Sequence, residues 1–133
     1  MLKDIDHIAV AVHSMEEALG TFRELYGIEP ERTEEIASDK ITEAMLRVGD
    51  TYLQLLEPTD PESTVAKFLE KRGPGLHHIA IAVDDLEGVL AHLKSKGAEL
   101  LDETPRIGGG GHRVVFVHPK TTHGILIELV ERG

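Results

Sequence analysis

Apolar positions along the chain follow two periods, and the resulting elements occur twice in the same order. A short β-branched stretch opens each half, at 5–12 and again at 76–83, as is typical of buried strands. Each stretch is followed by a segment whose apolar side chains recur at helical spacing. The apolar stripes of these two helices are predicted to be Met15, Ala18, Leu19, Phe22 and Leu25 in the first half, and Leu86, Val89, Leu90 and Leu93 in the second.

Turn and capping residues divide the rest of the chain. Ser14 with Glu17 forms a capping-box pattern at the start of the first helix, and Gly27 is a natural stop. Gly49 and Asp50 are typical of a hairpin turn, and the stretch 105–111, rich in glycine, is predicted to be a loop. The remaining strands are predicted at 28–36, 41–48 and 52–57 in the first half, and at 99–101, 113–117 and 124–131 in the second.

This order predicts an α+β fold made of two tandem βαβββ modules within one domain, 1–133. Module 1 covers about 3–58 and module 2 about 75–131, with a linker helix at about 63–72. We expect the two modules to form a curved mixed sheet around a shared cavity.

Composition narrows the classes of partner. The chain has 133 residues, no cysteine and a net charge of −10. The missing cysteines exclude disulfides and thiolate metal ligands, and the acidic balance argues against nucleic acid or an anionic membrane as the main partner. No apolar run approaches the roughly 18 residues that a membrane span needs, and the chain enters a strand almost at once, without a signal peptide. These features favour the cytoplasm.

The opening strand is repeated, and it carries a histidine at the same place in both copies. The stretch 6–12 matches 77–83, so that His7 corresponds to His78. Because side chains alternate along a strand, each histidine shares a face with small alanines, while the larger β-branched residues lie on the helix side. A lone histidine in a strand is often only a hydrogen-bonded core residue. Its repetition in both halves favours a site.

The last strand of each half interrupts its apolar pattern with one polar residue, Gln54 in the first and Glu128 in the second. A polar group in a buried strand is costly unless it is bonded to something. With His7 and His78 these residues form a pseudo-symmetric set of two imidazoles, one amide and one carboxylate. That set suits a divalent metal, and Co²⁺, Zn²⁺, Ni²⁺ and Mn²⁺ all fit.

Several motifs resemble the vicinal oxygen chelate superfamily and, within it, the methylmalonyl-CoA epimerase family. The resemblance covers essentially the whole chain, and the stretches that carry it are 6–9, 53–58, 63–67, 75–80, 105–108, 118–120 and 124–129.

The resemblance implies a reaction and a site. The reaction interconverts (2R)- and (2S)-methylmalonyl-CoA through an enolate. The implied metal ligands are His7, Gln54, His78 and Glu128, holding one divalent ion per chain, with Co²⁺ as the first expectation. The implied acid/base residues are Glu43 and Glu128, although Glu43 alone could be read as one of many surface acids. The family resemblance also implies a homodimer.

Contacts to the substrate are predicted more loosely. Basic side chains could meet the phosphates of coenzyme A, and backbone N–H groups of the glycine run could approach a ligand. The candidates are Lys67, Arg72, Arg106, Gly109, Gly110, Arg113 and Lys120.

Three alternatives share this fold. Glyoxalase I, a lactoylglutathione lyase, uses a similar ligand set, but Glu43 and the segment 63–75 favour the epimerase. An Fe(II) extradiol dioxygenase would use two histidines and one glutamate, and Gln54 argues against it. A non-catalytic protein that binds a small molecule is the third, although such proteins often lose the ligands that this chain keeps.

Overall fold

The computed structural model describes residues 1–133 and contains eight strands, three α-helices and three short 3₁₀ helices. The elements are, in chain order, β1 (Asp4–Ala11), α1 (Met15–Tyr26), β2 (Arg32–Ile36), η1 (Ala37–Asp39), β3 (Ile41–Val48), β4 (Thr51–Pro58), α2 (Thr64–Arg72), β5 (Gly75–Val83), α3 (Leu86–Ser95), β6 (Arg106–Ile107), η2 (Gly109–Gly111), β7 (Arg113–Val117), η3 (Pro119–Thr122) and β8 (Ile127–Glu131).

The strands form a mixed sheet in the order β2-β3-β4-β1-β5-β8-β7-β6. β5 and β8 pair in parallel, whereas the β2–β3, β3–β4, β6–β7 and β7–β8 pairs are antiparallel. Each half of the chain thus has a β-α-β-β-β order, with α2 between the halves. The predicted α+β class and the repeated module order are confirmed.

The chain divides into two compact units, which are described separately below. Unit 1 comprises Met1–His7 and His78–Gly133, and unit 2 comprises Ile8–His77. The strand β1 therefore contributes its first residues to unit 1 and its last residues to unit 2. The single domain and the shared cavity remain predictions.

In unit 2, α1 packs on one face of β3 and β4. Met15 of α1 joins Ala44, Leu46 and Leu55 in one apolar cluster, and Val10 packs against it, as the strand pattern predicted. The Ser14 side chain accepts a hydrogen bond from the Glu17 N–H at 3.1 Å, and Gly27 ends the helix with a φ of 65°. Both predicted helix boundaries are confirmed.

The second helix of unit 2, α2, covers a different cluster. Val65 and Leu69 pack with Leu56 of β4 and Ile41 of β3. The helix begins at Ser63, whose hydroxyl accepts a hydrogen bond from the Val65 N–H at 3.1 Å. This linker helix matches its predicted bounds of about 63–72.

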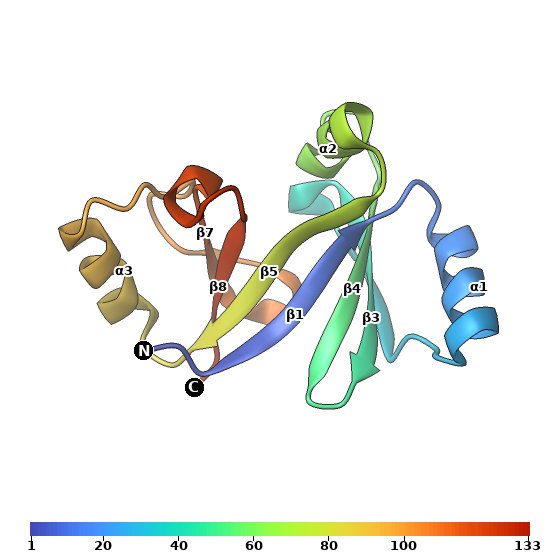
Figure 1. Cartoon of the computed structure of the whole chain (residues 1–133), viewed down its shortest axis with the longest axis horizontal. Helices are drawn as coiled ribbons and strands as arrows, with labels where there is room; N and C mark the ends of the chain where they lie inside the picture. The colour runs from blue at the N-terminus through green and yellow to red at the C-terminus, as the bar shows by residue number, and fades with distance from the viewer. The chain divides into compact units, whose positions relative to one another are not determined.

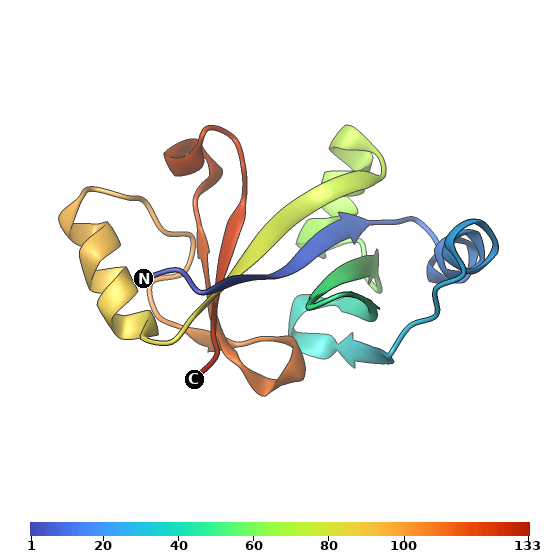
Figure 2. The same ribbon diagram turned by 60° about the horizontal axis from the view of Figure 1, so that its bottom comes forward.

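In unit 1, α3 packs on the sheet formed by β5, β8 and β7, beside which it lies in both views (Figures 1 and 2). Leu86, Val89 and Leu90 contact a cluster that includes Val83 and Leu129. The opposite face of these strands, with His78 on β5, Glu128 on β8 and Phe116 on β7, carries the polar groups described below. No helix of the chain is long and apolar enough to cross a bilayer.

Five sequence predictions need correction. Leu25 is 69% exposed rather than buried, because it lies outside the face of α1 that meets the sheet. The predicted strand 99–101 forms only an isolated bridge from Leu100 to Val117, whereas part of the predicted loop forms β6 by pairing with β7. β2 starts at Arg32 rather than residue 28. β8 starts at Ile127 rather than residue 124, because η3 and the turn after it precede the strand.

Candidate metal centre and buried carboxylates

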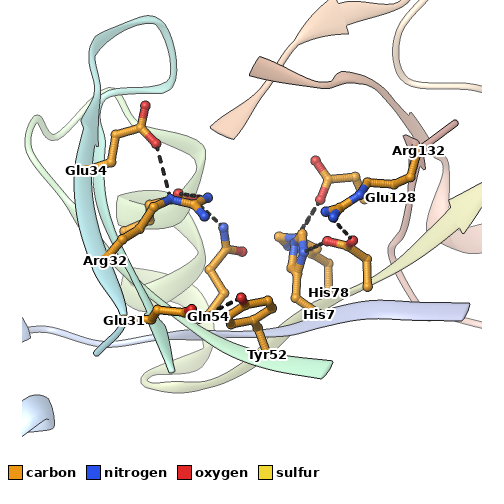
Figure 3. Close-up of polar contacts among 11 residues, drawn as sticks. His7, Glu31, Arg32, Glu34, Tyr52, Gln54, His78, Glu128 and Arg132 are labelled. Atoms are coloured by element: carbon orange, nitrogen blue, oxygen red, sulfur yellow. Dashed lines mark hydrogen bonds and ion pairs between the residues drawn. The ribbon is translucent and has the colours of Figure 1, made fainter. Parts of the chain in front are cut away.

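Three potential metal ligands meet in unit 1. His7 comes from β1, His78 from β5 and Glu128 from β8, and their ligand atoms all lie within 4.8 Å of one another (Figure 3). The Nε2 atoms of His7 and His78 are 3.4 Å apart, and they lie 3.1 and 3.2 Å from Glu128 Oε1. All three side chains are buried. The three side chains therefore form one buried cluster, and their role as metal ligands remains a prediction.

Strand register explains how the ligands come together. β5 and β8 run in parallel with Ala80 opposite Glu128, so the carboxylate lies on the same face as His78. Ala80 is completely buried and supplies only a methyl group beside the histidine. Phe116 lies opposite Glu128 on β7, and its ring meets the His78 ring edge-on at 5.2 Å between centroids. The alternation of side chains thus builds a buried, partly apolar wall around the donor atoms.

The charges of this cluster depend on one another. Burial opposes a charge on His7, but hydrogen bonds to Asp6 and Glu128 outweigh it and raise the pKa of His7 to about 9. Burial likewise opposes a charge on Glu128, but hydrogen bonds from His7 and His78 lower the pKa of Glu128 to about 2. Without a metal the cluster is therefore a buried imidazolium–carboxylate pair near neutral pH.

The donor set fits a divalent ion. Two imidazole nitrogens and one carboxylate oxygen converge from three strands, and this combination binds borderline metals such as Zn²⁺ and Co²⁺. A metal would take the place of the His7 proton, because a histidine ligand must be neutral at the coordinating nitrogen. The cluster is consistent with a divalent metal site, and it does not select one metal.

A second buried carboxylate lies in unit 2. Glu43 on β3 is fully buried and accepts hydrogen bonds from Gln54 Nε2 at 2.6 Å and from Arg32 Nη2 at 3.1 Å. Burial is the largest influence and raises the pKa of Glu43, although Gln54 and Arg32 both oppose it. Glu43 is therefore not one of the surface acids, and its setting differs from that of Glu128.

Gln54 has an unused acceptor. Its side chain is 7% exposed, and its Oε1 atom is buried without a hydrogen-bond partner. Gln54 lies opposite Met45 and shares a sheet face with Glu43, which its Nε2 holds. A buried amide oxygen without a hydrogen-bond partner destabilises the folded protein. Because Gln54 Oε1 has no partner within the chain, it is available to bind a ligand.

The predicted substrate contacts are scattered over the two units. In unit 1, Arg106 stacks over the Phe116 ring at 5.5 Å, whereas Arg113 is bound to Glu131 at 2.9 Å, on the α3 side of the sheet. Gly109 and Gly110 form part of η2, and Lys120 pairs with Glu99 at 2.9 Å. In unit 2, Lys67 and Arg72 project from α2, where Arg72 lies over the Phe68 ring. Substrate roles for these residues remain predictions.

The sequence reading missed three supporting residues. Asp6 binds His7 Nδ1 at 2.7 Å, and Arg132 binds the other oxygen of the Asp6 carboxylate at 2.9 Å. In unit 2, Arg32 binds Glu43. The position of Asp6 directly before His7 is a signal that could have been used, whereas Arg132 and Arg32 are distant in sequence from their partners and gave none.

Comparisons with known proteins identify the class. Residues 6–116 match the Glyoxalase/Bleomycin resistance protein/Dioxygenase superfamily. The chain belongs to this superfamily.

Within it, the chain is similar over nearly its whole length to methylmalonyl-CoA epimerases. The ethylmalonyl-CoA/methylmalonyl-CoA epimerase of Cereibacter sphaeroides is 34% identical, covering 97% of this chain and 98% of that protein. The structure of a variant of Streptomyces coelicolor methylmalonyl-CoA epimerase in complex with 2-nitronate-propionyl-CoA is 41% identical, with a TM-score of 0.95 over 100% of this chain and 96% of that chain. The uncharacterized protein YqjC of Bacillus subtilis is 36% identical, covering 96% of this chain and 91% of that protein.

Proposed function

We propose that the protein is a metal-dependent epimerase that interconverts (2R)- and (2S)-methylmalonyl-CoA. The observation that carries this proposal is the buried ligand set His7, His78 and Glu128 in a chain similar to methylmalonyl-CoA epimerases over nearly its full length. The fully buried Glu43 adds a second carboxylate, which an epimerase needs and a passive binding protein does not.

In this proposal His7, His78 and Glu128 hold one divalent ion, with Co²⁺ as the first candidate by family resemblance and Zn²⁺, Mn²⁺ or Ni²⁺ as others. Gln54 is proposed as the fourth ligand, which its unpaired buried amide oxygen supports. When bound, the ion supplies Lewis-acid stabilisation of the negative charge that develops when the α-proton of a thioester is removed.

Epimerisation removes the proton at C2 on one face and returns a proton on the other, so two acid/base groups are required. We assign these roles to Glu43 and Glu128. Their environments push the two pKa values apart: Glu43 has its pKa raised by burial, whereas two imidazoles hold the pKa of Glu128 at about 2. Glu43 is therefore the stronger base of the two and is expected to carry the more demanding proton transfer.

Arg106 is the substrate-contact candidate that we favour in unit 1. Its guanidinium stacks on Phe116, which in turn meets His78, so a cation is held near the ligand set. The substrate has a free carboxylate and several phosphates, all of which suit arginine. We further propose a homodimer, as the family resemblance implies, and a cytoplasmic location, which the composition without cysteine favours.

The nearest alternative is a glyoxalase I-type isomerase, which would act on the hemithioacetal of glutathione and methylglyoxal. It would use the same ligand set, but the full-length similarity to epimerases at 34–41% identity favours a malonyl thioester. An extradiol dioxygenase and a non-catalytic binding protein have no comparable support.

The test is a substrate panel. Metal-free protein is loaded in turn with Co²⁺, Zn²⁺, Mn²⁺ or Ni²⁺ and incubated with one enantiomer of methylmalonyl-CoA or ethylmalonyl-CoA, or with the hemithioacetal. The proposal predicts inversion at C2 of methylmalonyl-CoA and no isomerisation of the hemithioacetal. Turnover of the hemithioacetal alone would establish the glyoxalase alternative, and inactivity with all substrates and metals would remove the enzyme assignment.

A further inference from the structure

We propose that Asp6 and Arg132 are positioning residues that orient His7 for metal binding, through a chain of contacts from Arg132 to Asp6 to His7. The inference rests on the metal centre of the proposed function, but it does not depend on the identity of the substrate. All three residues lie in unit 1.

The first contact fixes the histidine ring. Asp6 Oδ2 lies 2.7 Å from His7 Nδ1, and both side chains are largely buried, at 13% and 8% exposure. A carboxylate can only accept here, so Nδ1 carries the hydrogen and the lone pair for a metal is directed to Nε2. It is Nε2 that lies beside His78 and Glu128. The contact therefore selects the nitrogen and sets the plane of the ring.

The second contact fixes the carboxylate. Arg132 Nη1 donates to Asp6 Oδ1 at 2.9 Å, so the two oxygens of Asp6 have separate partners. Arg132 therefore holds one carboxylate oxygen in place while the other contacts the histidine, and this fixes the orientation of the Asp6 carboxylate relative to His7.

The backbone around Arg132 is held on both sides. Its N–H donates to the Val83 carbonyl at 2.8 Å, and its own carbonyl accepts from Lys3 Nζ at 3.2 Å. Lys3 in turn donates its backbone N–H to Ala82 at 2.9 Å. The last residues of the chain are therefore anchored against the ends of β1 and β5, although the Arg132 side chain is 46% exposed. Because its backbone is held by these hydrogen bonds, Arg132 can keep its guanidinium in a fixed position against the Asp6 carboxylate.

The simplest competing explanation is that the Arg132–Asp6 pair only ties the two chain ends together. The two explanations differ in what they predict for metal affinity. A tie between the ends would lower the melting temperature when removed and leave metal affinity unchanged in the folded protein. An orienting chain would lower metal affinity, and Arg132 would matter only while Asp6 is present.

The experiment measures Co²⁺ and Zn²⁺ binding to metal-free protein by competition with a chromophoric chelator, together with the visible absorption spectrum of bound Co²⁺. The variants are Asp6→Ala, Asp6→Asn, Arg132→Gln and the Asp6→Ala/Arg132→Gln double variant. Asp4→Asn is the matched control, an exposed acid on the same strand. No thioester is present, so failure of the epimerase assignment does not affect the outcome.

We expect Asp6→Ala to weaken metal binding about 10–100-fold, the range found when an outer partner of a ligand is lost. Asp6→Asn, which keeps an acceptor, should be intermediate, Arg132→Gln should be milder than Asp6→Ala, and the double variant should match Asp6→Ala. The Co²⁺ spectrum should change in the Asp6 variants. Affinity within twofold of the parent in Asp6→Ala, or additive losses in the double variant, would overturn the proposal. Should Asp6→Ala fail to fold, unchanged affinity and spectrum in Arg132→Gln would overturn it alone.

Discussion

Unit 1 and unit 2 each bury a glutamate on a sheet face, but they surround it differently. Glu128 in unit 1 meets two imidazoles at 3.1 and 3.2 Å, and its pKa falls to about 2. Glu43 in unit 2 meets one neutral amide and one guanidinium from a half-exposed arginine, and burial raises its pKa. The same side chain is therefore favoured as the carboxylate anion in unit 1, whereas burial in unit 2 favours its protonated form.

The largest effect is expected from neutralising the carboxylate of unit 1. Glu128→Gln removes the anionic ligand that both histidines contact, and metal affinity should fall by more than about 100-fold, beyond the range for losing an outer partner. Chelator competition measures the change.

The control is Glu131→Gln, which alters an acid on the α3 face of the same strand that binds Arg113. It should leave metal affinity within twofold of the parent. Tight binding in Glu128→Gln would show that this carboxylate is not a ligand.

In the metal-free protein, the free energy of unfolding should depend on pH through the ionisation of His7 and Glu128 in unit 1. The folded pKa of His7, about 9, lies above its usual 6.5, so its contribution is complete below pH 6.5 and is lost as pH rises through 9. The folded pKa of Glu128, about 2, lies below its usual 4.5, so its contribution is complete above pH 4.5 and is lost as pH falls toward 2.

The free energy of unfolding without metal should therefore fall between pH 6.5 and 9, by roughly 2–3 kcal/mol from the His7 shift. Urea titrations across this range measure it. Glu128→Gln should flatten the decline because it removes a main partner of His7, whereas His92→Gln should leave it unchanged. A parent protein equally stable at pH 6.5 and 9 would contradict this electrostatic account.

A smaller effect is expected from removing the cation of unit 2. Arg32→Met leaves Glu43 with only the Gln54 hydrogen bond, and should cost about 1–2 kcal/mol of unfolding free energy at neutral pH, since Arg32 is 44% exposed and partly screened. The folded pKa of Glu43 lies above its usual 4.5, so the loss should shrink as pH falls through that raised pKa and the carboxyl becomes protonated in the folded protein.

Urea unfolding at pH 7 and pH 4 separates this effect from lost packing. Arg23→Met is the matched control, because Arg23 forms an exposed ion pair with Glu29 on the same unit. Its cost should stay below about 0.5 kcal/mol at both pH values. An equal loss at pH 7 and pH 4 in Arg32→Met would mean that the Arg32 side chain acts through packing rather than charge.

The sequence predicts the candidate metal ligands better than it predicts the residues that contact and orient them. The repeat that aligned His7 with His78 and the polar interruption at Glu128 are local patterns, and alternation along strands converts them into a shared face. Arg132 contacts Asp6 across a separation of 126 residues, and no periodicity encodes such a pair. Likewise, β6 forms where the sequence suggested a loop, because its pairing with Val114 on β7 is tertiary rather than local.

The sequence also could not predict the complete burial of Glu43 or the contacts that shift the pKa of each glutamate. From the sequence Glu43 could be read as one of many surface acids, whereas the structure buries it completely. Arg32 and Gln54 both oppose the effect of burial on the pKa of Glu43. Their contacts with the carboxylate depend on the register of β2, β3 and β4.

The most direct test of the division between the two glutamates is deuterium incorporation at C2 of methylmalonyl-CoA in D₂O, followed by proton NMR. The metal-loaded parent should exchange and invert C2. Glu43→Gln should bind metal as the parent does but exchange about 10²–10⁴-fold more slowly, whereas Glu34→Gln, which changes the exposed residue opposite Glu43 on β2, should exchange normally. Undiminished exchange in metal-loaded Glu43→Gln would contradict the assignment of Glu43 as the proton carrier.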